Sequence, residues 1–205
     1  MNKEEILNQA MTFGFGGMSE GELSYIYDYC IDKDILELGC EVGQSSYVMA
    51  SVAKSLICVD AWDDSYDHLI YDELQKEVYL NSLALKQNFN TEIQISVYDQ
   101  FKNNCKSYIK SSKITPVKGM TLDVVDNFKD AQFDLILIDA DHSFQGVYND
   151  INAYLPKLKP DGYLMFHDWG CGMWTGVKGA ADLATSEDKI EFVTRSERVA
   201  IYKLK

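Results

Sequence analysis

The stretch Ile35-Leu-Glu-Leu-Gly-Cys-Glu-Val-Gly-Gln-Ser-Ser46 decides the fold of this 205-residue chain. Its first residues belong to an apolar run of the kind found in a strand buried on both faces. Gly39 and Gly43 then predict a tight turn, because glycine lets the backbone pass close to a ligand. A helical pattern follows from Ser45. A strand, a glycine turn and a helix N-terminus together predict a nucleotide-binding crevice.

Further apolar runs follow and alternate with helical patterns. The predicted strands are 34–38, 56–59, 114–117, 133–138, 163–166, 190–193 and 199–202, and the predicted helices are 45–53, 98–110, 144–158 and 177–184. This alternation predicts an α/β fold with a parallel, doubly wound sheet and helices on both faces. Only the short turn 194–198 separates the last two strands, which predicts one antiparallel strand at the end of the sheet.

The composition of the chain limits the classes of partner and the cellular compartment that we expect. The formal net charge is −13, which argues against nucleic acid and anionic membranes as partners and favours a neutral or cationic small molecule. No apolar run approaches the roughly 20 residues of a membrane helix, and the N-terminus lacks a signal-peptide pattern. The five cysteines form no C-x-x-C pair, so we expect a reduced, cytoplasmic protein.

The domain organisation is expected to be simple. No Pro- or Ser-rich linker divides residues 1–205, which indicates a single domain. Residues 1–30 are expected to form a helical segment, in which 13–18 are a candidate flap over the ligand. Residues 62–96 interrupt the alternation and are expected to form an inserted helical lid, with a purely structural excursion as the alternative.

Asp60 is the first candidate binding residue. It ends the second predicted strand about 20 residues after Gly39, where a carboxylate can accept hydrogen bonds from both ribose hydroxyls. Glu41 stands where the dinucleotide-binding fingerprint has its middle glycine. Its charge argues against a pyrophosphate and is compatible with a ligand that carries an ammonium and a sulfonium group.

Five motifs in order resemble class I S-adenosylmethionine-dependent methyltransferases. The stretch 35–46 resembles motif I and Cys58-Val-Asp-Ala-Trp62 resembles motif II, while Val117-Lys-Gly-Met-Thr121 is similar to the loop that touches adenine. Ile138-Asp-Ala-Asp-His-Ser-Phe-Gln-Gly-Val147 and Leu158-Lys-Pro-Asp-Gly-Tyr-Leu-Met-Phe-His-Asp168 resemble small-molecule and sugar O-methyltransferases of the macrocin type. The resemblance covers about Met18 to Lys203.

The resemblance implies a seven-stranded, Rossmann-like sheet of order 3-2-1-4-5-7-6, with strand 7 antiparallel. It also implies the binding site for S-adenosylmethionine. The methionine end would lie against Glu37, Gly39 and Gly43, and the ribose against Asp60 with Trp62 nearby. The remaining implied residues are Gly119 and Met120 at the adenine and Asp139 at the methyl-transfer site.

Acidic and histidine side chains follow the fourth and fifth predicted strands and are expected to meet at one edge of the sheet. An acceptor hydroxyl must lose its proton to a base or to a metal-bound state. We expect Asp139 and His142 to be catalytic, with His142 as the base, and Asp139, His167 and Asp168 to be candidate Mg²⁺ ligands. Histidine suits Mg²⁺ poorly, and the alternative is that His142 and His167 only form structural hydrogen bonds.

The sequence therefore predicts a methyltransferase that acts on a hydroxyl of a small molecule or sugar. Two alternatives stay open, an NAD-dependent oxidoreductase on a similar sheet and a non-catalytic ligand-binding protein. Trp169 and Trp174 are expected to wall the acceptor pocket, or one of them to pack in the core. A homodimer is a further expectation.

Overall fold

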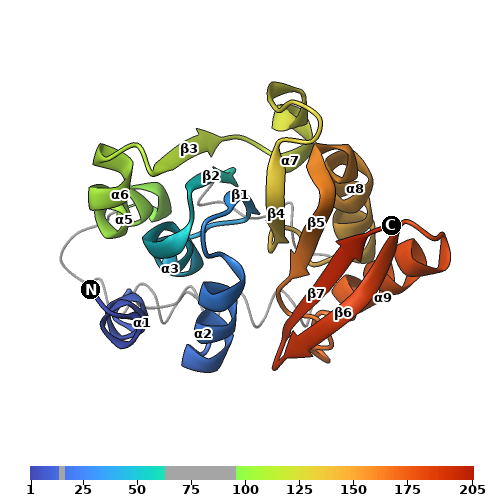
Figure 1. The fold of residues 1–205 in the computed structure, drawn as a ribbon, viewed down its shortest axis with the longest axis horizontal. Coiled ribbons are helices and arrows are strands. Elements are labelled where there is room, and N and C mark those ends of the chain that lie inside the picture. The colour runs from blue at the N-terminus through green and yellow to red at the C-terminus, as the bar shows by residue number, and fades with distance from the viewer. Residues whose placement is uncertain (14–16, 63–95) are drawn as a thin grey trace.

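Seven strands form one sheet through the centre of the molecule (Figure 1). The computed structural model describes residues 1–13, 17–62 and 96–205. The strand order is β3-β2-β1-β4-β5-β7-β6, which confirms the order predicted from the resemblance. The strands are β1 (Asp34–Leu38), β2 (Ser55–Asp60), β3 (Ile114–Lys118), β4 (Phe133–Ile138), β5 (Leu158–Phe166), β6 (Ile190–Ser196) and β7 (Val199–Leu204).

β1 occupies the middle of the parallel part of the sheet. Leu36 lies opposite Ile57 on β2 and Ile136 on β4, and both pairings are parallel. β7 runs antiparallel to β5 and to β6, as predicted. In parallel strands, the carboxyl ends all meet at one edge, which is where open α/β sheets bind ligands.

Helices cover both faces of the sheet (Figure 1). The helices in the described residues are α1 (Lys3–Met11), α2 (Glu20–Tyr29), α3 (Gln44–Val52), α5 (Val97–Asn104), α6 (Lys106–Lys110), α7 (Thr121–Val124), α8 (Phe144–Tyr154) and α9 (Thr175–Ser186). One buried cluster joins α1, α2, α3 and α5 to one face, and a second joins α8 and α9 to the other. This is the doubly wound arrangement predicted from the sequence.

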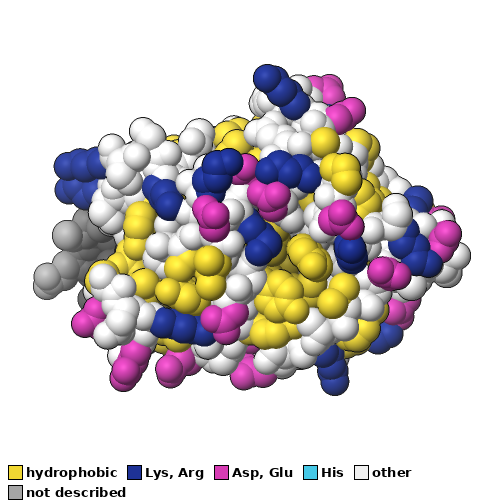
Figure 2. Space-filling view, viewed as in Figure 1, with side chains coloured by type: hydrophobic (Ala, Val, Ile, Leu, Met, Phe, Trp, Pro, Cys, Tyr) yellow, Lys and Arg dark blue, Asp and Glu magenta, His cyan; other side chains and the backbone are white. Residues whose placement is uncertain are grey.

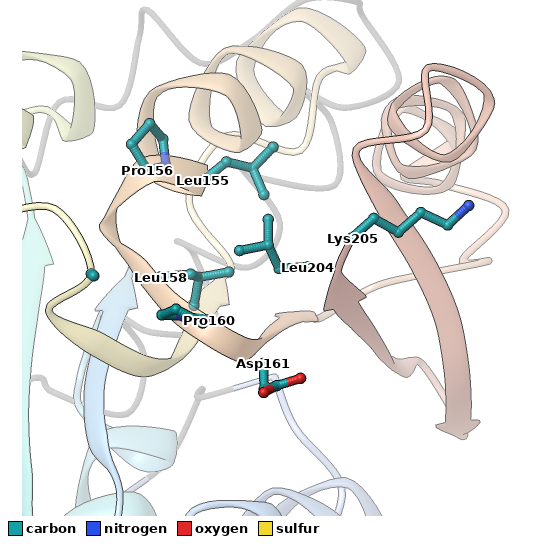
Figure 3. Close-up of a pocket in the computed structure, with 8 residues that line it drawn as sticks. Leu155, Pro156, Leu158, Pro160, Asp161, Leu204 and Lys205 are labelled. Atoms are coloured by element: carbon teal, nitrogen blue, oxygen red, sulfur yellow. The ribbon is translucent and has the colours of Figure 1, made fainter.

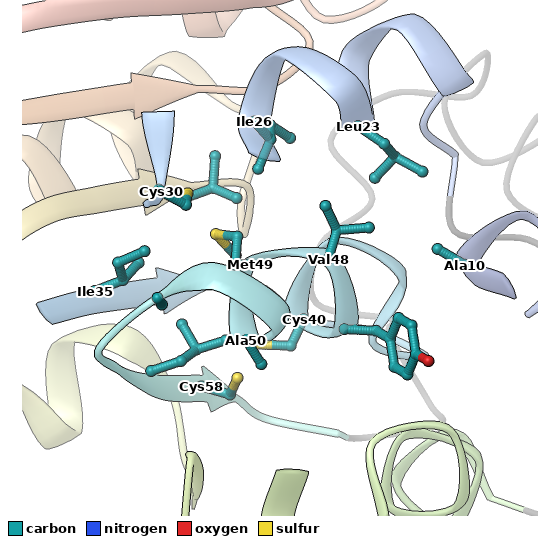
Figure 4. Packing of buried hydrophobic residues seen from close by; sticks show 14 of the residues in the cluster. Ala10, Leu23, Ile26, Cys30, Ile35, Cys40, Val48, Met49, Ala50 and Cys58 are labelled. Atoms are coloured by element: carbon teal, nitrogen blue, oxygen red, sulfur yellow. The ribbon is translucent and has the colours of Figure 1, made fainter. Parts of the chain in front are cut away.

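The first of these clusters is closely packed around α3. Met49 of α3 lies between Ile26 of α2 and Ile35 of β1, and Val48 lies on the side of Leu23 (Figure 4). None of these side chains has any exposed surface. Burial of one such side chain stabilises the fold by about 1.5–3 kcal/mol. Cys40 and Cys58 are also buried in this cluster, as expected for small apolar side chains.

Proline shifts one predicted boundary. The helix expected over 144–158 ends at Tyr154, and a short 3₁₀ helix with Pro156 in its first turn continues to Lys157. β5 then starts at Leu158, before its predicted start, and a register shift opposite Phe133 and Leu135 accommodates the extra residues. A bulge of this kind leaves the ladder locally unpaired, so a residue without an N–H such as Pro160 fits there.

The N-terminal segment contains two helices. Capping boxes start both of its helices, with Asn2 and Glu5 at α1 and with Ser19 and Glu22 at α2. The predicted lid over 62–96 lies outside the described residues except at its two ends, and residues 14–16 of the candidate flap also lie outside them. Among the helices that the structure describes, none is long and apolar enough to span a membrane.

Candidate active site

The turn after β1 brings two strand ends into contact. Gly39 has a φ of +86°, and a Cβ at this position would lie 2.2 Å from the carbonyl oxygen of Asp139. Only glycine therefore allows the ends of β1 and β4 to approach in this way. Gly43 closes the turn as the residue before α3. The predicted cofactor turn and the predicted catalytic Asp139 are thus direct neighbours.

Asp60 holds the same turn from the end of β2. Its Oδ2 accepts the backbone N–H groups of Cys40 at 2.7 Å and Glu41 at 2.9 Å, and its Oδ1 accepts that of Trp62 at 2.6 Å. The carbonyl oxygen of Asp60 accepts the N–H of Gly119 at 2.9 Å. The predicted ribose ligand and the predicted adenine loop therefore lie side by side, and the carboxylate already orders the crevice backbone.

Glu37 lies beneath this turn and not on its surface. The carboxyl group has no exposed surface, and it accepts hydrogen bonds from the hydroxyl groups of Ser45 and Ser46 in the first turn of α3. Burial outweighs these bonds and raises the pKa of Glu37 to about 7. Glu37 thus supports the turn from below, and its role at the methionine end of the cofactor stays a prediction.

Trp62 is likewise enclosed by protein. Only 2% of its surface is exposed, and its ring packs against Tyr98 and Phe101 with centroid distances of 4.5 and 4.7 Å. Its Nε1 donates to the carbonyl oxygen of Glu41 at 2.9 Å. Trp62 thus fixes the outer side of the crevice turn, whereas Met120 in the predicted adenine loop is 42% exposed.

Four acidic and histidine side chains meet at the ends of β4 and β5. The Oδ1 of Asp139 lies 3.2 Å from Nε2 of His142 and 3.0 Å from Nδ1 of His167. The Oδ2 of Asp168 lies 3.3 Å from Nε2 of His142 and 3.7 Å from Nδ1 of His167. The sequence prediction that these residues converge is confirmed by this geometry.

The two tryptophans beyond β5 take different positions. Trp174 lies over the His142 ring, with a centroid distance of 4.9 Å and an interplanar angle of 33°. Trp169 turns to the other side, where its Nε1 donates to the Tyr202 hydroxyl at 2.9 Å and its ring stacks on Phe192. Trp174 therefore borders the cluster at His142, and Trp169 packs against the C-terminal hairpin.

A family model described as "Methyltransferase domain" matches residues 36–169. The chain belongs to this methyltransferase family. The matched region begins in β1 and ends just after Asp168, so it contains both the cofactor turn and the cluster of Asp139, His142, His167 and Asp168. The family and the strand order together confirm the prediction of a class I, S-adenosylmethionine-dependent methyltransferase.

Solved structures share this fold at low sequence identity. The chain is similar to the O-methyltransferase TomG from Streptomyces achromogenes, with a TM-score of 0.63 and 11% identity over 98% of this chain and 88% of that one. A methyltransferase from Podospora anserina gives 0.63 and 13% over 99% and 87%. The O-methyltransferase NovP gives 0.62 and 15% over 91% and 81%. At these identities the likeness concerns the fold.

Curated relatives match only in part. An uncharacterised protein of Sinorhizobium fredii is 24% identical over 153 residues, which are 69% of this methyltransferase chain and 14% of that protein. A second, from Acanthamoeba polyphaga mimivirus, is 30% identical over 79 residues, which are 36% of this chain and 35% of that protein. The chain therefore spans well under half the length of these relatives.

Opposite charges face each other throughout the methyltransferase's cluster. Burial alone would lower the pKa of His142, but its hydrogen bonds to Asp139 and Asp168 raise it to about 9. The pKa of His167 rises to about 10 against burial because of the charge of Asp139. Conversely, burial opposes ionisation of Asp139, and the two histidines lower its pKa to about 2. Both imidazoles are therefore protonated at neutral pH.

Two residues next to this cluster were not predicted from the sequence to belong to the site. Glu22 of α2 has no exposed surface, and its Oε2 lies 3.7 Å from Nε2 of His167. Arg198, in the turn between β6 and β7, donates to Asp168 at 2.6 Å. The only sequence signal for Glu22 was the Ser19-x-x-Glu22 capping box, which predicts a helix start. A lone arginine in a hairpin turn carries no signal of its own.

A hollow lies at the opposite edge of the sheet. Its volume is about 570 Å³, and it is lined by Pro156, Leu158, Pro160 and Leu204 at the start of β5 and the end of β7 (Figure 3). It is remote from the strand ends that carry Asp139 and Asp168, because those are the carboxyl ends of β4 and β5. The hollow therefore lies apart from the cluster of acidic and histidine side chains.

Proposed function

We propose that this methyltransferase transfers the methyl group of S-adenosylmethionine to a hydroxyl of a small molecule. One observation carries the proposal: the Gly39 turn touches the backbone of Asp139. The cofactor crevice and the cluster of Asp139, His142 and Asp168 are therefore parts of one continuous site. The solved O-methyltransferases TomG and NovP share the fold, which supports oxygen as the acceptor atom.

The chemistry divides between positioning and proton removal. S-adenosylmethionine supplies a methyl group on a positively charged sulfonium sulfur. In the transfer, the acceptor oxygen forms a bond to the methyl carbon, the bond from sulfur to that carbon breaks, and the hydroxyl proton leaves to a base. His142 lies at the acceptor side under Trp174 and is the proposed proton acceptor. Asp139 orients the His142 ring through Nε2.

The negative charges of Asp139 and Asp168 oppose the role of His142 as a base, because they stabilise its protonated form. A His142 whose pKa is about 9 carries a proton at neutral pH, and only the neutral imidazole accepts one. A divalent cation bound to the two carboxylates would compensate their charge and return the pKa of His142 toward its ordinary value. The proposed cation would therefore leave His142 neutral and able to accept a proton, so the metal and the role of His142 as the base belong together in the proposal.

The residues fit such a cation. One ligand atom each from Asp139, His142, His167 and Asp168 lies within 4.8 Å of the others. Nε2 of His167 is buried without a hydrogen-bond partner and faces Glu22. Metal-bound histidines commonly present their other N–H to a carboxylate in this way. We propose Asp139, His167 and Asp168 as the ligands, and the mixed nitrogen and oxygen donors favour Mn²⁺ over the Mg²⁺ first expected.

The acceptor is proposed to be small and uncharged or cationic. The net charge of −13 repels phosphate backbones. On the face seen in Figure 2, acidic and basic side chains alternate and no continuous basic stripe is visible. The predicted homodimer and the cytoplasmic location stay predictions.

Cofactor binding tests the first half of the proposal. We expect Asp60→Asn to weaken binding of S-adenosylmethionine about tenfold or more, because it loses the negative acceptor for the crevice backbone and for a ribose. Isothermal calorimetry measures this change. The matched control is Asp161→Asn, an exposed aspartate at the opposite edge of the sheet. Equal affinities of wild type and Asp60→Asn would remove the ribose assignment.

Measurements of turnover test the proposed roles of His142 and of the metal. On any hydroxyl acceptor that the wild type methylates, we expect His142→Gln to lower turnover by about 10²-fold or more, the usual contribution of a general base, while cofactor affinity is retained. We also expect EDTA to abolish turnover and Mn²⁺ to restore it more fully than Mg²⁺. Full activity in EDTA would eliminate the metal, and equal losses of turnover and cofactor affinity in His142→Gln would argue against a base.

A further inference from the structure

Arg198 joins three separate parts of the chain next to the proposed metal ligands. Its Nη1 donates to Oδ1 of Asp168 at 2.6 Å. Its Nε and Nη2 donate to the two carboxylate oxygens of Glu22, each at 2.9 Å, and Nη2 also donates to the carbonyl oxygen of Gly17 at 2.8 Å. A planar guanidinium that makes these bonds together restricts all three partners in orientation.

The bond to Asp168 decides which of its oxygens faces the site. Arg198 takes Oδ1, and Oδ2 is the oxygen that lies within 3.7 Å of His142 and His167. Asp168 also has a φ of +54°, a left-handed conformation that costs free energy in a non-glycine residue unless neighbours hold it. The hydrogen bond from Arg198, which lies outside the cluster, stabilises this conformation of Asp168.

Glu22 completes the arrangement on the side of His167. Its Oε2 lies 3.7 Å from Nε2 of His167, and the Glu22 side chain is fully buried. Glu22 thus faces His167 and the guanidinium of Arg198 at the same time.

The same segment reaches the cofactor side. The N–H of Met18 donates to Oε1 of Gln44, the first residue of α3, at 3.2 Å, and both residues are buried. Ser19 donates to Glu197 in the turn that carries Arg198 at 2.6 Å. Residues 17–22 therefore run from the helix behind the cofactor turn to the end of β5 and the start of β7.

We propose that Glu22 and Arg198 are positioning residues of the methyl-transfer site. Arg198 orients Asp168, Glu22 orients His167, and their mutual ion pair makes the N-terminal segment 17–22 a structural part of the site. Both residues act through the cluster and neither contacts the reacting atoms. The inference deepens the proposed function and rests on it for the role of Asp168 and His167 as ligands.

The first test reads the cluster without any ligand. NMR spectra of the imidazole rings in the unliganded protein are compared among wild type, Glu22→Gln, Arg198→Lys and Arg198→Met. We expect the signals of His167 and His142 to shift in Glu22→Gln and Arg198→Met, and to shift less in Arg198→Lys, which keeps the charge but loses the fork. Lys203→Met is the control, because it breaks only the ion pair with Asp161 at the opposite edge.

The second test uses Mn²⁺ and S-adenosylhomocysteine as probes in calorimetry. Loss of an outer residue that orients a ligand weakens metal binding by about 10–100-fold, and we expect this for Glu22→Gln and Arg198→Met. Affinity for S-adenosylhomocysteine should stay at the wild-type value, which shows that the variants are folded. Arg198→Lys should fall between wild type and Arg198→Met. In a double-mutant cycle, the effects of Glu22→Gln and Arg198→Met should be far from additive.

The outcomes separate the two proposals. A wild type that binds neither probe contradicts the proposed function, and the imidazole spectra then decide the positioning role alone. A wild type that binds both probes, with unchanged spectra and unchanged Mn²⁺ affinity in Glu22→Gln and Arg198→Lys, overturns the positioning role. These two conservative variants keep the test decisive even where Arg198→Met fails to fold because it leaves Glu22 buried and unpaired.

Discussion

At the scale of single residues, the carboxyl group of Glu37 is fully buried and accepts hydrogen bonds from three donors. Burial raises its pKa more than these bonds lower it, and the result is a pKa of about 7. A folded-state pKa above the unfolded value of 4.5 means that the native protein binds this proton more tightly. The stabilisation is complete below pH 4.5 and is lost as the pH rises through about 7. A shift of this size corresponds to about 3 kcal/mol.

We therefore predict a pH-dependent effect of Glu37→Gln. Because glutamine is neutral at every pH, the variant should gain about 3 kcal/mol in unfolding free energy relative to wild type between pH 4 and pH 8. Urea denaturation at several pH values measures the difference. Glu191→Gln on the exposed face of β6 is the control. A difference between wild type and Glu37→Gln that does not change with pH would show that the carboxyl is not held neutral.

Single residues also show how far the sequence predicts a site. Asp139, His142, His167 and Asp168 were predictable because each follows a strand end, and parallel strands bring their carboxyl ends to one edge. Glu22 and Arg198 were not, since their meeting depends on how α2 packs beside the β6–β7 turn. Sequence separations of 176 and 30 residues lie between Arg198 and its partners Glu22 and Asp168, and no local pattern encodes such contacts.

At the scale of elements, the start of α9 presses against the loop that carries His142. A Cβ on Gly176 would lie 2.4 Å from the backbone N of Phe144 and 2.5 Å from the carbonyl oxygen of His142. Backbone atoms cannot move aside as a flexible side chain can. We predict that Gly176→Ala lowers stability by about 1–3 kcal/mol and lowers turnover, because α9 and the His142 loop must separate.

Gly179 gives the matched control within the same helix. Its nearest neighbour for an added Cβ is a ring atom of Phe144 at 3.2 Å, on a side chain that is 43% exposed and free to turn. Gly179→Ala should therefore raise stability by about 0.5–1 kcal/mol through helix propensity, with turnover unchanged. Thermal denaturation and turnover measure both variants. Equal stability of the two would mean that contact between α9 and the loop imposes no constraint.

Elements also differ in how well the sequence predicts them. β1, β2 and β4 were predicted within one residue, because parallel strands buried on both faces are uninterrupted apolar runs. The helix predicted over 98–110 is instead divided into α5 and α6 at Cys105. Cys105 is fully buried, and its Sγ lies 3.6 Å from the carbonyl oxygen of Gly43. This tertiary contact overrides a helical periodicity that continues across the break.

At the scale of the whole molecule, the charge of −13 acts on every ligand that approaches the crevice. At neutral pH, S-adenosylmethionine carries a net charge of about +1 because of its sulfonium, and S-adenosylhomocysteine is close to neutral. A negative protein field attracts the donor and not the product that remains after methyl transfer. The field of dispersed surface charges weakens as salt shortens the Debye length from about 30 Å at 0.01 M to about 3 Å at 1 M.

We predict from this field that the preference for S-adenosylmethionine over S-adenosylhomocysteine falls as salt increases. The ratio of their dissociation constants, measured by calorimetry from low to high NaCl, should change by about two- to tenfold, because long-range attraction contributes on the order of 1 kcal/mol. The dissociation constant of S-adenosylhomocysteine should change little with salt, since this ligand is nearly neutral. A ratio that is constant with salt would show that short-range contacts near the sulfur discriminate the two ligands, and that the net charge of the methyltransferase has no part in cofactor selection.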